Sequence, residues 1–327
     1  MSQPLLTVEN LHLAFQTPLG AAQALRGVSF SVEPGQIFGL VGETGCGKSI
    51  TGRAILGLLP PTAKITAGRI VFAGQELLKL GERERHKLRG RRIAMIFQDP
   101  TTALNPVYTI GQQLTMVMKH HRMAAGQELR RRAGQLLADV GLPFPEALLK
   151  SYPHQLSGGM QQRVMIAMAL STEPDLLIAD EPTTALDVTI QSQILELLVQ
   201  LQRSRGITII LITHNMGIVA ETCQQVAVLY AGRIVEQGQV RDIFYRPRHP
   251  YTQGLLAALP KPEQWRQPLK VIPGSAPDAL QPISGCAFAS RCEYVMEVCR
   301  QQQPPLFELG AHHQAACYLY HQVQERS

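Results

Sequence analysis

The sequence has few cysteines and no long hydrophobic run. It contains 6 cysteines and 1 tryptophan in 327 residues. Apolar stretches such as residues 207–212 (ITIILI) are far shorter than the ~20 residues that a membrane-spanning helix needs. The first ten residues have no basic region followed by an apolar run, so they do not resemble a secretory signal. We therefore expect a cytosolic protein without disulfide bonds, which associates with a membrane only through partner proteins.

A long run of one charge is also missing. The net charge is +6, from 31 basic and 25 acidic residues, and the two signs are mixed in residues 81–92 (GERERHKLRGRR). Such a mixed stretch is typical of a solvated helix face, whereas a nucleic-acid-binding arm concentrates positive charge. We therefore expect no nucleic-acid partner. The length and the hydrophobic content of 45% indicate about two globular domains.

Short apolar segments alternate with helical patterns along most of the chain. The candidate strands are residues 36–42, 92–98, 175–180, 207–214 and 225–238, and the clearest candidate helices are residues 48–59 and 191–206. This alternation predicts an α/β fold with a mainly parallel sheet. Residues from about 100 to 152 have helical patterns without a convincing strand, so they predict a helical insertion.

Residues 42–49 (GETGCGKS) match the phosphate-binding loop G-x-x-x-x-G-K-[ST], with a strand before it and a helix after it. The glycines let backbone N–H groups face phosphate oxygens, and the helix N-terminus adds the positive end of its dipole. Lys48 would contact the β- and γ-phosphates, and Ser49 would ligate Mg²⁺. Cys46 is interpreted as a small side chain of this loop rather than a catalytic thiol.

Residues 175–181 (DLLIADE) carry a second nucleotide signal. Asp180 ends an apolar strand at the sheet edge where ligands bind in such folds, and it can hold Mg²⁺ through water. Glu181 can polarise the attacking water as a general base. Charged residues often mark ordinary strand ends, so this acidic pair alone would be weak evidence for nucleotide binding. It becomes strong evidence because the same chain has a full phosphate loop.

Residues 156–163 (LSGGMQQR) lie between these signals, and with them the chain resembles the ATP-binding-cassette (ABC) ATPases, whose signature is LSGGQ-like. Met160 stands where many members carry glutamine. The resemblance implies an ABC-type P-loop NTPase with a RecA-like core, an antiparallel β subdomain and the helical insertion. It also implies that Ser157, Gly158 and Gly159, at a helix N-terminus, bind the ATP held by the opposite subunit of a dimer.

Other family positions follow in order along the chain. Phe15 matches the aromatic residue that stacks on adenine, with a place in the core as the alternative. Gln98 matches the glutamine that contacts Mg²⁺ and the attacking water, and His214 matches the histidine that contacts the γ-phosphate. Residues 184–187 (TALD) match the loop that crosses the dimer. Asn215, directly after His214, replaces the aspartate that is common at that place and makes a dimer contact in the family.

The residues that the resemblance assigns to the site fall into three groups. The catalytic residues are Glu181, His214, Gln98 and Lys48, and the Mg²⁺ ligands are Ser49, Gln98 and Asp180. The nucleotide-binding residues are Phe15, Gly42, Glu43, Thr44, Gly45, Cys46, Gly47, Lys48, Ser49, Ile50, Gln98, Asp180 and Asp187, with Ser157, Gly158 and Gly159 from the opposite subunit.

Four longer stretches narrow the resemblance to the ATPase subunits of bacterial dipeptide and oligopeptide importers. They are residues 95–106, 152–160, 176–191 and 248–260. The family implies a peripheral ATPase on the cytoplasmic face of the inner membrane, beneath two membrane-spanning permease subunits. It also implies a second, related ATPase subunit and an extracytoplasmic solute-binding protein. Importers of nickel or metallophores share these stretches, so they stay open as alternatives.

Two more distant functions are disfavoured. A soluble cassette ATPase that acts on nucleic acid or ribosomes usually has two fused cassettes or a long coiled coil, and this chain has one cassette. A non-catalytic regulatory cassette would not need the intact Glu181 and His214. We expect an ATPase domain over residues 1–245, with a helical subdomain at about 99–160, and a small Cys-rich C-terminal domain over residues 246–327.

Four of the six cysteines lie in this last segment: Cys286, Cys292, Cys299 and Cys317. Their spacing lacks the C-x2-C pairs that are common in structural zinc sites, and four thiolates from loops could ligate an iron–sulfur cluster. The resemblance to peptide importers with this tail implies a [4Fe–4S] cluster, while Zn²⁺ and reduced thiols remain alternatives.

Three further residues near or outside this cluster are not expected to bind a metal. His312 and His313 lie near Cys317 and could replace a ligand, although positions on the surface are the simpler expectation. Cys223 is expected to be a small buried residue. A cluster would hold together a segment with little core of its own and would take no part in ATP chemistry.

Overall fold

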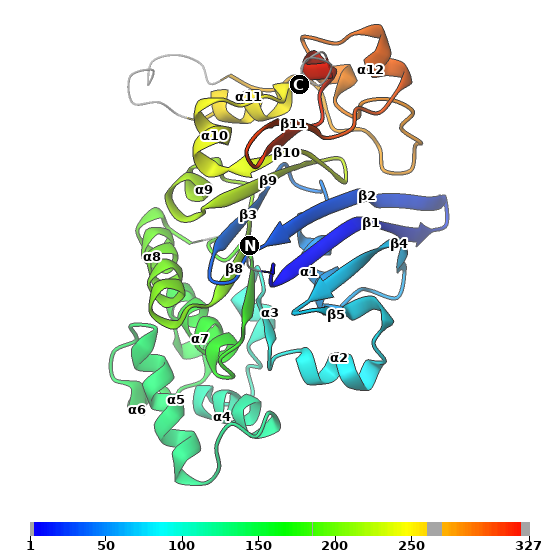
Figure 1. Cartoon of the computed structure of the whole chain (residues 1–327). Coiled ribbons are helices and arrows are strands. Elements are labelled where there is room, and N and C mark those ends of the chain that lie inside the picture. Colours follow the sequence, from blue (N-terminus) through cyan, green and yellow to red (C-terminus); the bar gives the residue numbers. More distant parts are fainter. Residues whose placement is uncertain (1–2, 185, 260–269, 322–327) are drawn as a thin grey trace. The chain divides into compact units, whose positions relative to one another are not determined.

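The computed structural model describes residues 3–184, 186–259 and 270–321 (Figure 1). The chain forms two compact units. The first unit comprises Met1–Glu33, Ile37–Lys79 and Thr213–Ser327, and the second comprises Pro34–Gln36 and Leu80–Ile212. Each unit thus combines segments that are separated in the sequence, and each carries part of the candidate site.

The first unit contains an antiparallel sheet, as the family resemblance implies. Its strands are β1 (Leu6–Thr17), β2 (Gly20–Val32), β4 (Ala63–Phe72) and β5 (Gln75–Glu76), in the order β2-β1-β4-β5, and β5 leads into a 3₁₀ turn at Leu77–Lys79. Leu6 and Val8 of β1 are buried, whereas Thr7 and Glu9 between and beyond them are more exposed. Successive side chains of a strand point to opposite faces, so one face of β1 packs in the core.

A second set of strands in the first unit pairs in the order β11-β12-β10-β9-β3. They are β3 (Ile37–Val41), β9 (Gln225–Tyr230), β10 (Arg233–Gln239), β11 (Phe307–Gly310) and β12 (His313–Ala315). Strands β3 and β9 are parallel, and the other pairs are antiparallel. Every residue of β3 is buried, and α9 (Met216–Thr222) packs so closely that a Cβ on Gly39 would lie 3.2 Å from the side chain of Val219.

The prediction of one strand over residues 225–238 is wrong. The chain turns at Ala231 and Gly232, whose φ angles are 45° and 79°, and Arg233 pairs back with Tyr230. Two consecutive residues in the left-handed region form the tight turn of a β-hairpin. The N–H of Gly232 donates to the carbonyl oxygen of Cys46 at 2.9 Å, so this turn lies against the phosphate loop.

The second unit has three parallel strands in the order β8-β7-β6, which supports the predicted α/β class. They are β6 (Ile93–Ile96), β7 (Leu176–Asp180) and β8 (Thr208–Thr213). Every residue of these strands is buried. Continuous apolar runs of this kind are typical of parallel strands that are covered on both faces.

Helices make up the rest of the second unit. They are α2 (Glu82–Leu88), α3 (Pro100–Ala103), α4 (Ile110–His120), α5 (Gln127–Asp139), α6 (Pro145–Leu148), α7 (Gly158–Leu170) and α8 (Val188–Arg205), with a 3₁₀ turn at Pro153–Gln155 (Figure 1). Helices α3 to α6 form the segment that was predicted as a helical insertion. Leu114 and Met118 of α4 are buried on the same face, because residues four apart share a helix face. Leu137 of α5 is also buried.

Two helix boundaries differ from the predictions because local capping decides them. Helix α1 (Lys48–Leu56) ends at Gly57, whose φ is 65°, and does not continue to Leu59. Helix α8 begins at Val188, three residues earlier than expected, because the Asp187 side chain accepts a hydrogen bond from the N–H of Ile190 at 2.9 Å. Among the described residues, none of the helices has both the length and the apolar character to cross a bilayer.

The C-terminal segment of the first unit contains α10 (Val240–Tyr245), α11 (Pro250–Ala257), a 3₁₀ turn at Ala289–Arg291 and α12 (Glu297–Gln301). A buried carboxylate joins it to the sheet. Glu236 of β10 is 0% exposed and accepts hydrogen bonds from the N–H groups of Arg248 at 2.7 Å and His249 at 2.9 Å. His313 of β12 bonds the same carboxylate at 2.8 Å.

The expectation that His313 lies on the surface is therefore wrong. Its side chain is buried because β12 pairs with β10 and brings the imidazole onto Glu236. His312, in contrast, is exposed in the turn between β11 and β12, where its φ is 64°.

We predict that Glu236→Ala lowers the free energy of unfolding by about 3–5 kcal/mol, because it leaves buried partners unpaired. Urea unfolding of the full chain measures this. Glu308→Ala, at an exposed position of β11, is the matched control and should change stability by less than about 0.5 kcal/mol. Equal stabilities of the two variants would contradict the role of Glu236.

Candidate functional site

The phosphate loop connects β3 to α1 in the first unit, and close contacts require two of its glycines. A Cβ on Gly42 would lie 2.2 Å from the carbonyl oxygen of Leu229 on β9. A Cβ on Gly47 would lie 2.7 Å from Cδ2 of Leu25 on β2, and the φ of Gly47 is 111°. The loop backbone is therefore held against two strands without room for side chains at these positions.

Lys48 is buried inside the loop, with 4% of its surface exposed. Its Nζ donates to the carbonyl oxygens of Gly42 at 2.8 Å and Glu43 at 2.9 Å. These bonds offset the cost of burying an ammonium group and hold its positive charge at the loop. Around it, Thr44 and Gly45 are exposed, and Ser49 and Ile50 are half-buried in α1.

Cys46 is buried beside Lys48, with its Sγ 4.0 Å from Nζ. Burial raises the pKa of this thiol, so it stays protonated at neutral pH. A protonated, buried thiol is a poor nucleophile, which agrees with its interpretation as a small side chain of the loop.

Gln98, Glu181 and Thr184 meet beyond the ends of β6 and β7 in the second unit. Glu181 Oε2 accepts from Gln98 Nε2 at 3.3 Å and from Thr184 Oγ1 at 2.9 Å. The parallel register places Gln98 and Glu181 together, since Ile96 pairs with Ala179 and each of the two residues lies two positions after its member of this pair. Asp180, the last residue of β7, is 2% exposed. The hydroxyl of Thr184 was not foreseen as a partner of Glu181.

Glu181 has a φ of 45°, which is unusual for a residue other than glycine. Its N–H donates to the carbonyl oxygen of Ile212 at 2.9 Å, so the backbone bond to β8 continues past the strand end. Residues in such a conformation are concentrated at functional sites, because the surrounding structure must compensate the strain.

The signature residues form the start of α7. Ser157 is the N-cap, and its Oγ accepts from the N–H of Met160 at 3.4 Å. Gly158 is exposed and Gly159 is half-buried. A Cβ on Gly159 would lie 2.8 Å from Cγ2 of Ile190, so the start of α7 packs closely against α8. Asp187 caps α8, and within TALD residue 185 lies outside the described residues.

The three remaining candidates belong to the first unit. Phe15 is half-buried on β1, where it pairs with Ala22 and Ala63. His214 is exposed between β8 and α9. Asn215 caps α9, because its Oδ1 accepts from the N–H of Gly217 at 2.8 Å. An asparagine performs this capping as well as an aspartate does, so the departure from the common aspartate leaves the helix cap intact.

The four C-terminal cysteines lie in one region of the first unit, but the structure does not show the predicted metal centre. Burial raises the pKa of Cys286, Cys292 and Cys317, the last to about 11, and neighbouring thiols of this set add to each shift. Among the residues that the structure describes, however, no three His, Cys, Asp or Glu side chains are grouped as ligands for a metal ion.

Two hydrogen bonds give the local arrangement of these cysteines. The N–H of Cys286 donates to the carbonyl oxygen of Cys299 at 2.7 Å, and the Cys286 carbonyl accepts from Ala289. The backbone therefore joins the first and third cysteines of the set. Cys223 is buried against α9, as expected, and burial raises its pKa to about 12.

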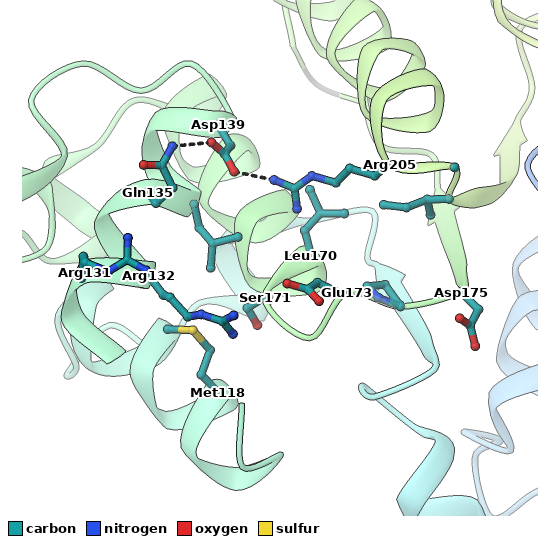
Figure 2. Close-up of a pocket in the computed structure, with 14 residues that line it drawn as sticks. Met118, Arg131, Arg132, Gln135, Asp139, Leu170, Ser171, Glu173, Asp175 and Arg205 are labelled. Atoms are coloured by element: carbon teal, nitrogen blue, oxygen red, sulfur yellow. Dashed lines mark hydrogen bonds and ion pairs between the residues drawn. The ribbon is translucent and has the colours of Figure 1, made fainter. Parts of the chain in front are cut away.

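A cavity of about 520 Å³ in the second unit lies among α5, the end of α7 and the end of α8 (Figure 2). None of the candidate site residues lines it. Arg205 pairs with Asp139 at its wall, and Arg131 pairs with Glu128 at 2.7 Å. These two arginines are therefore already engaged by carboxylates of the same unit.

Two family models match the chain. The model for ABC transporters matches residues 25–184, and the model for the C-terminal region of oligopeptide/dipeptide transporters matches residues 235–299. The first match includes the phosphate loop, the signature and the Asp180–Glu181 pair, and the second includes three of the four C-terminal cysteines.

Several characterised proteins are similar to nearly the whole chain. The dipeptide transport ATP-binding protein DppD of Bacillus subtilis is 49% identical over 99% of this chain and 97% of its own length. The oligopeptide transport ATP-binding protein OppD of the same organism is 49% identical, over 97% and 89%. DppD of Escherichia coli is 46% identical over 96% of both chains.

Solved structures extend the similarity to the fold. A dimeric ATP-binding cassette in a post-hydrolysis state, bound to ADP and Pi, is 28% identical with a TM-score of 0.65, over 72% of this chain and 99% of that one. The protein cbiO1 of Clostridium perfringens, part of an ABC transporter complex, is 32% identical with a TM-score of 0.64, over 75% and 92%.

We predict that Gly42→Ala lowers the free energy of unfolding by about 3 kcal/mol, because overpacking against Leu229 adds to backbone strain. Gly45→Ala is the matched control in the same loop. Gly45 has a φ of 82° but open space around it, so the cost should be about 1 kcal/mol. Chemical unfolding measures both, and the reverse order would contradict the close contact at Gly42.

Proposed function

Because the chain belongs to the ABC ATPases of the dipeptide and oligopeptide importers, we propose that it hydrolyses ATP to energise the uptake of di- or oligopeptides across the bacterial inner membrane. The observation that carries this proposal is the similarity to dipeptide and oligopeptide transport ATP-binding proteins over 97% or more of the chain. The ABC transporter match by itself would support ATP hydrolysis without indicating the solute.

ATP and Mg²⁺ fit the donor set that the chain offers. The hydroxyl of Ser49, the carboxylate of Asp180 and the side-chain oxygen of Gln98 are the hard oxygen ligands that Mg²⁺ prefers. Lys48 would contact the β- and γ-phosphates, and the N–H groups of the phosphate loop would face their oxygens. Bound Mg²⁺ would supply positive charge that neutralises the phosphates during transfer. Phe15 would stack on adenine.

Glu181 would orient the attacking water and act as its general base. Its bonds from Gln98 and Thr184 to Oε2 support this role, because they hold the carboxylate in one orientation. His214 would contact the γ-phosphate. In such reactions the protein contributes positioning and electrostatic stabilisation more than covalent chemistry.

A second ATPase subunit would complete each nucleotide site. Ser157, Gly158 and Gly159 would bind the ATP of the opposite subunit through the N-terminus of α7. Asp187, which caps α8 close to this turn, would contribute to the same surface. We propose a related but distinct ATPase chain as the partner.

The wider assembly would include two membrane-spanning permease subunits and, indirectly, an extracytoplasmic solute-binding protein. The chain would lie at the cytoplasmic face of the inner membrane as a peripheral subunit. Residues 1–245 would form the ATPase domain, with residues 99–160 as its helical subdomain next to the permeases, and residues 246–327 would form the C-terminal addition.

Transport of nickel or a metallophore is less favoured. The similar proteins of Bacillus subtilis and Escherichia coli are named for dipeptide or oligopeptide transport. Uptake of a labelled dipeptide and of nickel by cells with and without this gene separates the two. Loss of nickel uptake with intact peptide uptake would reject the peptide proposal. Action on nucleic acid or ribosomes is not favoured either, because the similar proteins named above are transport proteins.

We further propose that Cys286, Cys292, Cys299 and Cys317 hold a [4Fe–4S] cluster, with Zn²⁺ as the alternative. The neighbourhood of the four thiols supports this, because the other three cysteines of the set contribute to the raised pKa of Cys317. The cluster would hold the segment together and take no part in hydrolysis.

Protein purified without oxygen should show visible charge-transfer absorbance together with iron and acid-labile sulfide. Cys292→Ser should reduce all three signals, whereas Cys223→Ser, at a buried cysteine outside the set, should leave them unchanged. Zinc without iron would favour the alternative, and the absence of both metals would reject a metal centre.

We predict that Glu181→Gln binds ATP with near-normal affinity but hydrolyses it at least about 100-fold more slowly, because the general base is lost. ATP turnover in the purified transporter complex and equilibrium ATP binding measure the two effects. Glu173→Gln, the same change at an exposed position of the second unit, is the control. Near-normal hydrolysis by Glu181→Gln would reject Glu181 as the base.

A further inference from the structure

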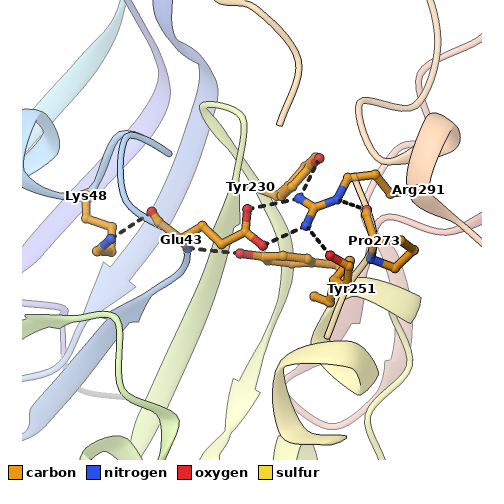
Figure 3. A network of polar contacts seen from close by, with 7 residues as sticks. Glu43, Lys48, Tyr230, Tyr251, Pro273 and Arg291 are labelled. Carbon is orange, nitrogen blue, oxygen red and sulfur yellow. Dashed lines mark hydrogen bonds and ion pairs between the residues drawn. The ribbon is translucent and has the colours of Figure 1, made fainter. Parts of the chain in front are cut away.

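The second residue of the phosphate loop, Glu43, is bound by the C-terminal segment (Figure 3). Arg291 Nη1 donates to Glu43 Oε2 at 2.9 Å, and Arg291 Nη2 donates to Glu43 Oε1 at 3.1 Å. This two-pronged pair joins residues that are 248 positions apart in the sequence. Arg291 stands directly before Cys292, so the contact links the phosphate loop to the cysteine-rich segment.

Arg291 is held rigidly for this contact. Its side chain is 5% exposed, and Nε donates to the Pro273 carbonyl at 2.9 Å. Nη2 also donates to the Ile272 carbonyl at 3.2 Å, and Nη1 also donates to Tyr230 Oη at 3.3 Å. A guanidinium has five N–H donors, and these five bonds engage all of them. A lysine has three donors and could not reproduce the set.

Aromatic rings support the same side chain. The guanidinium carbon of Arg291 lies 5.7 Å from the ring centre of Tyr230 and 5.9 Å from that of Phe288. Tyr251, which is fully buried, lies with its ring centre 4.6 Å from that of Tyr230. Cation–π contacts of this kind favour the charged guanidinium at a site that water hardly reaches.

Glu43 is therefore fixed at three points. Arg291 binds its carboxylate, Tyr251 Oη accepts from its N–H at 2.9 Å, and its carbonyl accepts from Lys48 Nζ at 2.9 Å. The hydrogen bond with Tyr251, like the pair with Arg291, comes from the C-terminal segment, since Tyr251 lies on α11. The peptide groups on both sides of Glu43 belong to the loop that would bind phosphate.

The carboxylate of Glu43 poses an electrostatic problem in a phosphate-binding loop. A negative charge in this place repels phosphate, and nothing in the loop motif requires an acidic residue there. The bidentate pair with Arg291 neutralises the charge and directs the carboxylate toward the C-terminal segment. The segment thus removes a repulsion and restrains the loop at the same time.

We propose that Arg291 is a positioning residue for the phosphate loop, through which the C-terminal segment sets the affinity of the chain for ATP. This inference rests on the proposed binding of ATP at that loop. It adds a role for the C-terminal segment in the nucleotide site, separate from any metal that the cysteines hold.

The test is a double-mutant cycle on the full-length chain, with the dissociation constant of Mg-ATP as the readout. Arg291→Met should weaken binding about tenfold, because it leaves the Glu43 carboxylate unpaired beside the phosphates. Glu43→Gln should weaken it less, by about threefold, because the charge that loses its partner is then the Arg291 guanidinium, which does not repel phosphate. The double variant should bind more tightly than Arg291→Met, and Arg291→Lys should lie between Arg291→Met and the unmodified chain.

Arg300→Met is the matched control. Arg300 is an exposed arginine on α12 and adjoins Cys299, just as Arg291 adjoins Cys292. It should leave ATP binding unchanged. In ATPase assays, Arg291→Met should raise KM for ATP about tenfold and change kcat by less than about threefold, since the loop binds phosphate in the ground state as well.

Two results would overturn the inference while leaving the proposed function intact. One is unchanged ATP affinity in Arg291→Met. The other is a double variant whose fold-loss of ATP affinity equals the product of the fold-losses of the two single variants. Arg291 would then act independently of Glu43. If the unmodified chain itself does not bind ATP, the proposed function fails, and this inference fails with it.

Hydrogen exchange of the loop gives a second readout if Arg291→Met does not fold. Glu43→Gln changes a side chain that is 32% exposed and keeps its shape, so it should fold. We expect faster amide exchange in residues 42–49 of this variant, because the charged bond that restrains the loop is weakened. Exchange equal to that of the unmodified chain would overturn the inference.

Discussion

The close approach of three backbone segments determines the position of the phosphate loop in the first unit. Gly42 lies against the carbonyl of Leu229 on β9, and Gly232 in the β9–β10 turn lies against the carbonyl of Ala24 on β2. The N–H of Gly232 also bonds the carbonyl of Cys46 inside the loop. Side chains at these glycines would separate the segments, so the contacts of Lys48 and Glu43 depend on their absence.

In the second unit, the end of an apolar sheet brings polar side chains together. Strands β6 and β7 are buried at every position, and their parallel register determines which residues emerge side by side. Gln98 and Glu181 consequently meet where the backbone leaves the sheet. Thr184 adds a hydroxyl from the following turn and restrains the carboxylate further.

Charged side chains attach the C-terminal segment to the rest of the first unit. Glu236 of β10 bonds the N–H groups of Arg248 and His249 and the imidazole of His313. Arg291 of the same segment pairs with Glu43 in the phosphate loop. Buried charges are costly unless every polar atom finds a partner, so each anchor specifies one arrangement. The segment that carries the cysteines is thereby in direct contact with the loop.

Local patterns in the sequence were sufficient to locate the phosphate loop, the signature, the Asp180–Glu181 strand end and the helices of the insertion, because each depends on residues close together in the chain. The same patterns predicted one strand where β9 and β10 form a hairpin, since apolar residues continue across Ala231 and Gly232. They also placed His313 at the surface, because the pairing of β12 with β10 has no local signal.

The tertiary structure decided the contacts that join distant segments. The Arg291–Glu43 pair spans 248 positions and requires five acceptors and two aromatic rings around one guanidinium. No short pattern encodes such a convergence, since its hydrogen bonds form only after packing has brought the segments together. The sequence by itself determined which groups could perform the chemistry, and the fold determined which other groups hold them in position.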